Sequence, residues 1–400
     1  MSEARVGISE ADLPLEADLP ATSSETRSAY VDQVVIGYLL YGVGAITAFL
    51  AVALSLSDTA AALHSSMLAI GLLGAGVTGD RLDAVIGPRA AHGAAYLLLA
   101  LASGCLITAP AFVVTLAGAG MVGLATGLLL ARVNRTLTRG GGALARVRMG
   151  RAALVAMFGS MSVPVVIGLG EASGLGWQVA LVAAGLLIVA GVLVARGRRW
   201  TSTSMTTSAG GLRRSFWLAW WLIVLVVSVE FAIVFWASSL VERQVGISLG
   251  DATLVAAGFY AGMATARVGI SIDAVSRRDP IALMRFGLLV ALAGTLLAWS
   301  AEDVPAASLG IYLGGVGTGF QYPLGVSVAL ALVPSLQDRA SARLILASGV
   351  AILAAPFVLG MAADAAGVSF AWLLIPALCL ASLVLSVPVS RARARPIANA

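Results

Sequence analysis

Two charged residues lie inside long apolar stretches of this chain. Glu230 follows Trp217 by 13 residues in the run 217–240, and its neighbours from Leu222 to Trp236 are apolar apart from Ser228. A helix rises 1.5 Å per residue, which places this carboxylate about 20 Å from the start of the run. A charge at the centre of a membrane helix costs about 2.5–3.5 kcal/mol and by default marks a transport pathway or a proton relay. We therefore predict that Glu230 couples proton movement or binds a solute; the structural alternative is a carboxyl group paired with a neighbouring helix.

Arg267 is the second charge of this kind. It lies in the apolar run 251–273, six residues before Asp273, and so about 9 Å inside that boundary. Such a side chain either snorkels to the membrane interface or faces a cavity as the partner of an anion or of Glu230. The depth difference between Arg267 and Glu230 is on the order of 10 Å. The sequence therefore leaves a direct pair between them open.

Aromatic and amide side chains in the apolar runs offer stacking surfaces and hydrogen bonds to a solute. The candidates are Tyr38, Tyr41, Trp236, Tyr260, Gln321 and Tyr322. Each of them is equally well explained by helix packing or by the aromatic belt at a membrane interface. Asp32 and Gln33, at the beginning of the first run, are expected to be solvated.

Apolar runs account for most of the chain. Its residues are 59% hydrophobic and 11% charged, whereas a soluble globular protein is about 25% charged. A helix needs roughly 20 apolar residues to cross about 30 Å of hydrocarbon. Twelve such runs are expected, at 30–54, 61–81, 90–109, 112–133, 148–170, 176–196, 217–240, 251–273, 280–300, 305–332, 343–363 and 369–389. The composition predicts an all-α membrane protein with about twelve transmembrane helices.

The positions of the basic residues predict the orientation of these helices. All 25 basic residues are arginine. If the N-terminus is cytoplasmic, the arginines of the connecting segments fall inside, and only Arg243 falls outside. This is the positive-inside bias. We expect a multi-pass protein of the bacterial inner (plasma) membrane with both termini cytoplasmic, and we expect the lipid bilayer rather than nucleic acid as the partner of its basic surface.

Two stretches of the sequence recur at nearly the same offset. Residues 76–80, Gly-Val-Thr-Gly-Asp, recur as 269–273, Gly-Ile-Ser-Ile-Asp, and the proline-containing stretch 163–168 recurs as 355–360. The offsets of 193 and 192 residues are about half the chain, which predicts two equivalent halves, as in transporters built from repeats. The predicted units are a disordered cytoplasmic tail 1–27, a six-helix bundle 28–196, a cytoplasmic linker 197–215, a second six-helix bundle 216–390 and a cytoplasmic tail 391–400.

Motifs of several enzyme classes do not occur in the sequence. It contains no Walker A sequence, no H-E-x-x-H and no cluster of cysteine and histidine. Cys105 and Cys379 both lie in apolar runs and indicate no disulfide framework. We therefore expect no enzymatic activity, no cofactor and no metal. A non-transporting membrane receptor is a further alternative, which the lack of a large soluble domain disfavours.

The twelve runs, with a basic linker between six and six, resemble the major facilitator superfamily. The stretch Gly76-x-x-x-Asp80-Arg81 is similar to the signature loop of that superfamily, G-x-x-x-D-R-x-G-R-R, but Asp83 stands where the family usually has glycine. The second copy keeps the glycine and aspartate and has alanine for the arginine. The resemblance implies alternating access between two six-helix bundles. The gating residues it implies, with the repeated prolines, are Gly76, Asp80, Arg81, Arg132, Gly269, Asp273, Pro164 and Pro356.

The residue types of this loop suit a gate for physical reasons. A glycine at position 76 would let its helix lie close against a neighbour. A carboxylate at position 80 would suit the N-terminus of an adjacent helix, and Arg81 can pair with it or with lipid phosphate. The family resemblance implies that Arg132 can also pair with Asp80. The alternative is that the loop only anchors the topology.

A finer resemblance concerns the branch of the superfamily. Val229-Glu230 with Trp236, the stretch 123–134 and the stretch 319–323 resemble the fucose-permease-like branch, which includes sugar–proton symporters. The predicted function is therefore proton-coupled secondary active transport of a small solute, carried out by a monomer. The alternative is a proton-driven exporter of drugs or metabolites. The P-x-x-x-G element at Pro164 is similar to the antiporter motif of drug exporters, but Val163 replaces the glycine that precedes the proline there.

Overall fold

The computed structural model describes residues 21–198, 200, 211–270 and 277–394, and the regular structure of these residues is helical. The N-terminal half of the chain contributes α1 (Ser23–Ala53), α2 (Asp58–Ile86), α3 (Pro88–Thr108), α4 (Phe112–Thr138), α5 (Gly142–Ala172) and α6 (Val179–Ala195). The C-terminal half contributes α7 (Arg214–Val245), α8 (Leu249–Ile270), α10 (Pro280–Trp299), α11 (Val304–Gly319), α12 (Gln321–Ala331), the short 3₁₀ helix η2 (Pro334–Leu336), α13 (Gln337–Ala366), α14 (Val368–Trp372) and α15 (Leu374–Ala394).

The helices confirm the predicted all-α membrane fold. Within the described residues, ten helices are long and apolar enough to cross a membrane. The apolar α6, with 17 residues, and the consecutive pair α11 and α12 bring the number of spans to the twelve that the apolar runs predict. The tenth span is divided because α11 ends at Gly319 and α12 begins at Gln321. Pro323 lies in the first turn of α12, where a helix tolerates proline.

The start of α1 corrects the predicted extent of the N-terminal tail. Residues 23–27 were expected to be disordered, but α1 begins at Ser23. Thr22 is the N-cap, its side chain accepts a hydrogen bond from the backbone of Glu25, and the Glu25 carboxylate accepts one from the backbone of Thr22. This capping box satisfies two backbone N–H groups that the first turn would otherwise leave without partners. Residues 1–20 and 395–400 of the predicted tails lie outside the described residues, as does most of the predicted linker.

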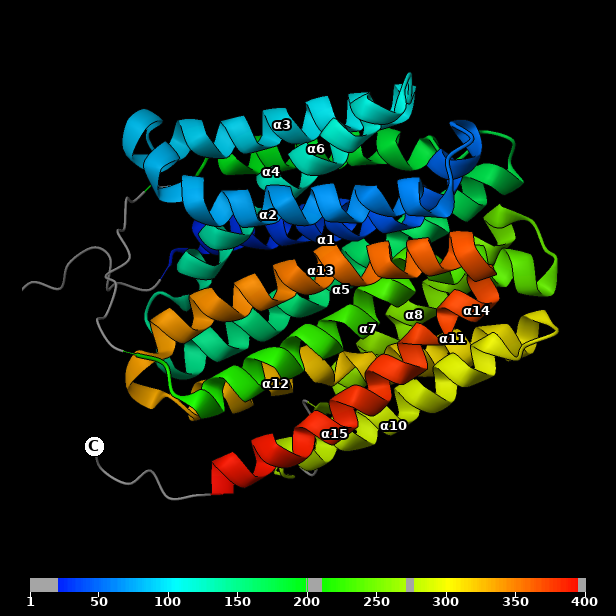
Figure 1. Cartoon of the computed structure of the whole chain (residues 1–400). Helices are drawn as coiled ribbons and strands as arrows, with labels where there is room; N and C mark the ends of the chain where they lie inside the picture. The colour runs from blue at the N-terminus through cyan, green and yellow to red at the C-terminus, as the bar shows by residue number, and fades with distance from the viewer. Residues whose placement is uncertain (1–20, 199, 201–210, 271–276, 395–400) are drawn as a thin grey trace, which may run out of the picture.

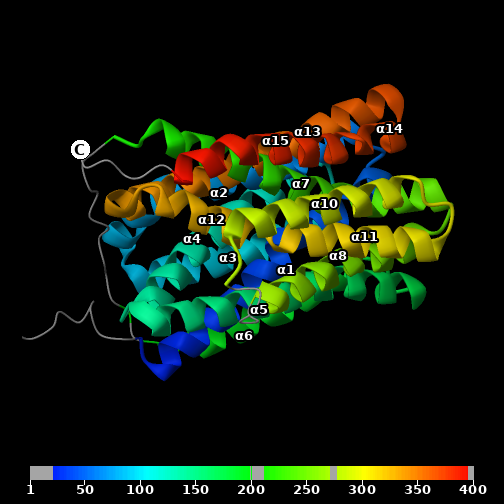
Figure 2. The same cartoon turned by 90° about the horizontal axis from the view of Figure 1, so that it is seen from below.

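The packing of the C-terminal half repeats that of the N-terminal half. Helix α2 packs against α4 as α8 packs against α11, and α1 packs against α5 as α7 packs against α13. The contacts between the halves show the same symmetry, because α2 meets α13, α5 meets α8 and α1 meets α7. A repeat offset of 192 or 193 residues relates the members of each set. The predicted duplication therefore describes the arrangement of the helices as well as the sequence (Figures 1 and 2).

Helices α1 and α7 occupy the centre of this arrangement. In the most apolar window of each, 78% of the residues are buried inside the protein, against 39–50% for the other spans. Residues in the middle of these two helices are therefore shielded by protein rather than by lipid. Both candidate residues Tyr41 and Glu230 lie in this pair of helices.

The chain alternates between two ends of the helix array (Figure 1). We call the end with Ser23 and Arg393 the tail end. The opposite end, which carries the α1–α2, α7–α8 and α13–α14 connections, is the far end. Arg243, in the last turn of α7, lies at the far end. This alternation places the arginine-rich connections together at the tail end, as the sequence predicts.

Glycines allow the closest helix contacts within each half. A Cβ at Gly123 of α4 would lie 2.8 Å from the carbonyl carbon of Leu68 in α2. At the equivalent position of the C-terminal half, a Cβ at Gly315 of α11 would lie 2.8 Å from the carbonyl carbon of Phe259 in α8. Side chains at these two positions would push the backbones apart.

Alanine at Gly123 or at Gly315 is expected to lower the thermal unfolding midpoint of the detergent-purified protein, because overpacking a tight contact costs about 1–3 kcal/mol. Gly104 of α3 is the matched control, since it is exposed and a Cβ there would have nothing within 4 Å. Gly104→Ala should leave the midpoint close to that of the unmodified protein. Equal midpoints for all three variants would show that the close contacts do not limit stability.

Candidate functional site

A hydrogen bond joins the two halves of the protein in the middle of α1 and α7. The Tyr41 hydroxyl donates to Glu230 Oε1 over 2.6 Å. Glu230 is only 4% exposed and lies in the middle of the 32-residue α7. Hydrogen bonds to an ionised carboxylate are short and stronger than those between neutral groups. The carboxylate that the sequence singles out is therefore held by a side chain of the other half.

Aromatic rings surround this hydrogen bond. The Tyr41 ring stacks on Phe231 with a centroid separation of 5.4 Å and meets Tyr260 of α8 edge-on at 5.7 Å. Offset and edge-on arrangements are the favourable ones for aromatic pairs. Phe231 was not among the predicted site residues. Its position next to Glu230 in an all-apolar stretch gave no signal that its ring would face α1.

Two further predicted residues belong to the same region. The positive charge of Arg267, in the last turn of α8, is close enough to act on Glu230, Tyr41 and Tyr322. Glu230 in turn acts on Tyr260 and Tyr322. The structure thus brings together Tyr41, Glu230, Tyr260, Arg267 and Tyr322 as one cluster, which we call the central site.

Three other predicted residues have bonds elsewhere. The Tyr38 hydroxyl donates to the carbonyl oxygen of Ala180 in α6 over 2.8 Å, within the N-terminal half. Trp236 Nε1 donates to the carbonyl oxygen of Pro356 in α13 over 3.1 Å. Gln321 Nε2 donates to the carbonyl oxygens of Met284 and Gly317, at 3.1 and 2.9 Å. Hydrogen bonds of this kind hold helices of one half together.

The central site has the chemical groups that a coupled transporter needs. Glu230 can be ionised or protonated, and the phenols of Tyr41, Tyr260 and Tyr322 can donate hydrogen bonds. The rings of Phe231 and the tyrosines give the site apolar surroundings, and Arg267 adds a positive charge.

The signature loop at the tail end forms a different set of ion pairs from the one expected. Arg132 of α4 pairs with Asp83, not with Asp80, and also donates to the carbonyl oxygen of Pro88 over 3.0 Å. Arg135 pairs with Asp80 at 3.0 Å and with Asp83 at 3.2 Å. Asp83 therefore holds both arginines at the position where the family usually has glycine. The aspartate in place of the family's usual glycine was the feature of the sequence that could have predicted these ion pairs.

The glycines of the two loop copies are not at close contacts. Among the described residues, no heavy atom would lie within 4 Å of a Cβ at Gly76 or at Gly269. The expectation that Gly76 lets α2 lie close against a neighbour is wrong for this conformation. Arg81 is exposed, and Asp273 lies outside the described residues. Pro164 and Pro356 both lie inside continuous helices, α5 and α13.

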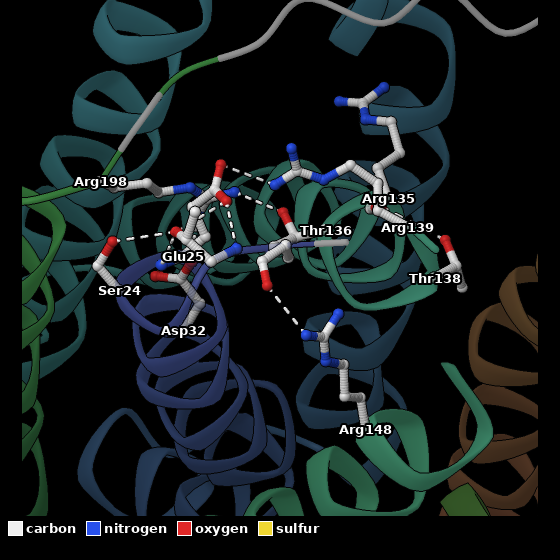
Figure 3. A network of polar contacts seen from close by, with 11 residues as sticks. Ser24, Glu25, Asp32, Arg135, Thr136, Thr138, Arg139, Arg148 and Arg198 are labelled. Atoms are coloured by element: carbon white, nitrogen blue, oxygen red, sulfur yellow. Dashed lines mark hydrogen bonds and ion pairs between the residues drawn. The ribbon is translucent and has the colours of Figure 1, made fainter. Parts of the chain in front are cut away.

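Asp32 is buried, which corrects the expectation that it is solvated. It is fully buried in α1 and accepts a hydrogen bond from the Tyr96 hydroxyl over 2.7 Å. His92 Nε2 lies 3.2 Å from its carboxylate, and Arg198 pairs with it at 3.2 Å. Arg198 also donates to Thr136 over 2.7 Å, so this network joins α1, α3 and α4 to the residues after α6 (Figure 3).

A second ion pair lies beside this network. Glu25, the capping residue of α1, pairs with Arg139 after α4 at 2.7 Å (Figure 3). Arg139 therefore neutralises Glu25 in the first turn of α1, and Arg198 of the linker neutralises Asp32 further along the helix. The network braces the tail end of the N-terminal half as one unit.

Comparison with solved structures gives the fold. The chain is similar to a bacterial homologue of the human lysosomal transporter Spinster, in its inward-facing and unoccupied conformation, with a TM-score of 0.71 and 13% identity over 93% of this chain and 98% of that one. It is similar to the D-xylose–proton symporter, with a TM-score of 0.73 and 16% identity over 90% and 96% of the two chains. The major facilitator superfamily transporter FucP, in the outward conformation, matches with a TM-score of 0.58 and 17% identity over 92% and 100%.

These likenesses show that the chain has the major facilitator fold, as the signature loop predicts. No protein-family model matches the sequence, and no curated protein matches it. The fold is therefore recognised from the arrangement of the helices. The identities of 13–17% leave the solute and the coupling to be argued from the residues of this chain.

The ion pairs of the signature loop lead to a stability prediction. Arg132 is 5% exposed, so Asp83→Asn leaves a buried guanidinium without its carboxylate, a change that costs up to about 3–5 kcal/mol. Asp80 is 64% exposed, so Asp80→Asn should cost at most about 1 kcal/mol. Thermal unfolding in detergent measures both. A larger loss for Asp80→Asn than for Asp83→Asn would contradict this assignment of partners.

Proposed function

We propose that this protein is a secondary active transporter that moves a small solute across a membrane by alternating access. The moving parts are two six-helix bundles, residues 28–196 and 216–390, joined by the linker 197–215. The observation that carries the proposal is the hydrogen bond between Tyr41 and Glu230, which joins the bundles at their buried centre. The fold, shared with known transporters of sugars and other solutes, supports it.

Proton coupling follows from what protonation does to this bond. An ionised Glu230 accepts a charge-assisted hydrogen bond from Tyr41, whereas a protonated one offers a weaker neutral partner. Protonation therefore loosens α1 from α7, the two central helices. It also removes the attraction between Glu230 and the positive charge of Arg267. A proton that binds at Glu230 thus changes the balance between two arrangements of the bundles.

The solute is expected to bind at the same place. Its contacts would be the phenols of Tyr41, Tyr260 and Tyr322, the ring of Phe231 and the charges of Glu230 and Arg267. A solute that takes the Tyr41 hydroxyl as its own partner would compete with Glu230 for it. Solute and proton would then act on one hydrogen bond, which is a physical basis for coupling them.

The arginine-rich connections support a cytoplasmic tail end in a bacterium, with the helices in the inner membrane and both termini inside. The protein would act as a monomer, because each chain contains both bundles and the site between them. The same site serves import by symport and export by exchange for protons. Uptake of the labelled solute by an expressing strain indicates import, and a gain in resistance to the solute indicates export.

The proposal is tested by replacing Glu230 with glutamine. A thermal-shift screen of the purified protein against sugars, carboxylates and drug-like cations at several pH values first identifies a solute. In proteoliposomes, Glu230→Gln should abolish accumulation driven by a pH gradient and leave solute exchange at equal pH, because the amide cannot take up the proton. Tyr41→Phe should weaken the coupling.

Tyr38→Phe is the matched control, since it removes a hydroxyl one helical turn away whose bond lies within the N-terminal half. It should accumulate solute as the unmodified protein does. Accumulation by Glu230→Gln at the level of the unmodified protein would remove Glu230 from the coupling mechanism. Absence of any flux for every solute that shifts the unfolding midpoint would favour a receptor.

A further inference from the structure

A salt bridge connects the two halves at the far end. Arg243, in the last turn of α7, donates from Nη1 to Asp58 Oδ2 and from Nη2 to Asp58 Oδ1, each over 2.9 Å. Asp58 is the first residue of α2. Two parallel hydrogen bonds between a guanidinium and a carboxylate fix the orientation of the two groups as well as their distance. The C-terminal half is therefore tied to one defined point of the N-terminal half.

A second contact ties the same point to another helix. Asp364, near the far end of α13, accepts hydrogen bonds from the backbone N–H groups of Asp58 and Thr59, at 2.8 and 2.9 Å. The first N–H groups of a helix have no partner within it, and the helix dipole favours an anion there. The first turn of α2 is thus held by a cation from α7 and by an anion from α13.

A cavity of about 130 Å³ lies directly against this cluster. Its walls come from α1, α2 and α7, and Asp58 and Arg243 are among the residues that line it. Trp236 and Ser239 of α7 line it as well, and Ser239 is 6% exposed. The cavity lies between the two halves, and the salt bridge forms part of its wall.

Other contacts at the far end also bring the two halves close together. A Cβ at Gly360 of α13 would lie 2.8 Å from the carbonyl oxygen of Asp58, and a Cβ at Gly250 of α8 would lie 2.7 Å from Cβ of Glu171 in α5. The ion pairs described above at the tail end, such as Arg132 with Asp83, each lie within one half. These contacts add to the salt bridge in joining the two halves at the far end.

The sequence supports a specific role for Arg243. In the proposed topology it is the one arginine of the connecting segments on the outer side, where the positive-inside bias disfavours it. We propose that Asp58, Arg243 and Asp364 form an outer gate that closes the path between the bundles on the extracellular side; this rests on the proposed function. The cavity is what remains of the outer half of that path in this conformation. Because the Arg243 side chain is 46% exposed, its salt bridge is screened by solvent, and the gate can open at low cost.

The test measures access to the cavity from outside. Ser239→Cys places a thiol in the cavity wall, in a background where Cys105 is replaced by serine. A membrane-impermeant maleimide is added to intact cells, and labelling is located by peptide mapping. Labelling should be slow while the gate is intact and at least several-fold faster with Arg243→Ala or Asp364→Asn. Arg243→Lys keeps the positive charge, so its labelling rate should be closer to that of the intact gate than the rate of Arg243→Ala is.

Two controls separate opening of the gate from general damage. Glu242→Gln changes a residue that lines the cavity on the same turn of α7 as Arg243. In this variant, Ser239→Cys should be labelled at the slow rate of the intact gate. Cys379, which is fully buried in α15, should stay unlabelled in every variant, because only unfolding exposes it. Equal labelling of Ser239→Cys in the Arg243→Ala, Asp364→Asn and Glu242→Gln variants would overturn the gate.

The outcome is independent of the proposed transport activity, because labelling needs neither a solute nor a pH gradient. Faster labelling with Arg243→Ala but no flux in proteoliposomes would support the gate and overturn the transporter. Proton-driven flux with no change in labelling would support the transporter and overturn the gate.

Discussion

A carboxylate buried in a membrane protein needs a partner, and here the partner comes from the other half of the chain. Glu230 lies in the middle of α7, and Tyr41 of α1 supplies the hydrogen bond. Without a donor, the buried carboxylate would bear its full desolvation cost. Since α1 and α7 are the two most buried spans and are related by the repeat, whatever sets their relative position also sets that of the halves. The requirement to satisfy one side chain thus becomes a constraint on the whole arrangement.

The remaining polar contacts are distributed unevenly along the helices. At the tail end, Asp32 pairs with Arg198 of the linker and Asp83 with Arg132 and Arg135 of α4, and these pairs brace the N-terminal half as a unit. At the far end, Asp58 receives Arg243 of the C-terminal half, and the halves are tied together. A rigid half can move as a body only if its internal contacts are stronger than those to its partner. Buried ion pairs within a half and a solvent-exposed pair between halves give that order of strength.

Local patterns in the sequence predict the elements of this structure better than the contacts between them. Hydropathy and arginine positions predict the twelve spans and their alternation, and the offset of the repeats predicts which helices are equivalent. The capping box of Thr22 and Glu25 is just as local, and it places the start of α1 inside the stretch expected to be disordered. By contrast, Tyr41 and Glu230 are 189 residues apart in the chain. No periodicity encodes such a pair, which exists only because two helices cross. Local sequence patterns therefore predict that a buried charge is present but not which residue is its partner.

The two halves have the same helix arrangement, but only the C-terminal half has a carboxylate in the middle of its central helix. This difference has a steric reason. At the offset of 193 residues that relates the two loop copies, Glu230 corresponds to Gly37. A Cβ at Gly37 would lie 3.0 Å from the carbonyl carbon of Ala156, so α1 and α5 meet there backbone to backbone. A second carboxylate at that position would have no room, whereas α7 accommodates the whole Glu230 side chain and turns it toward α1. Close packing at one copy and a charge at the other leave the two central helices with a carboxylate at Glu230 and none at Gly37. Under the proposed function, this difference would let two similar halves respond to one proton.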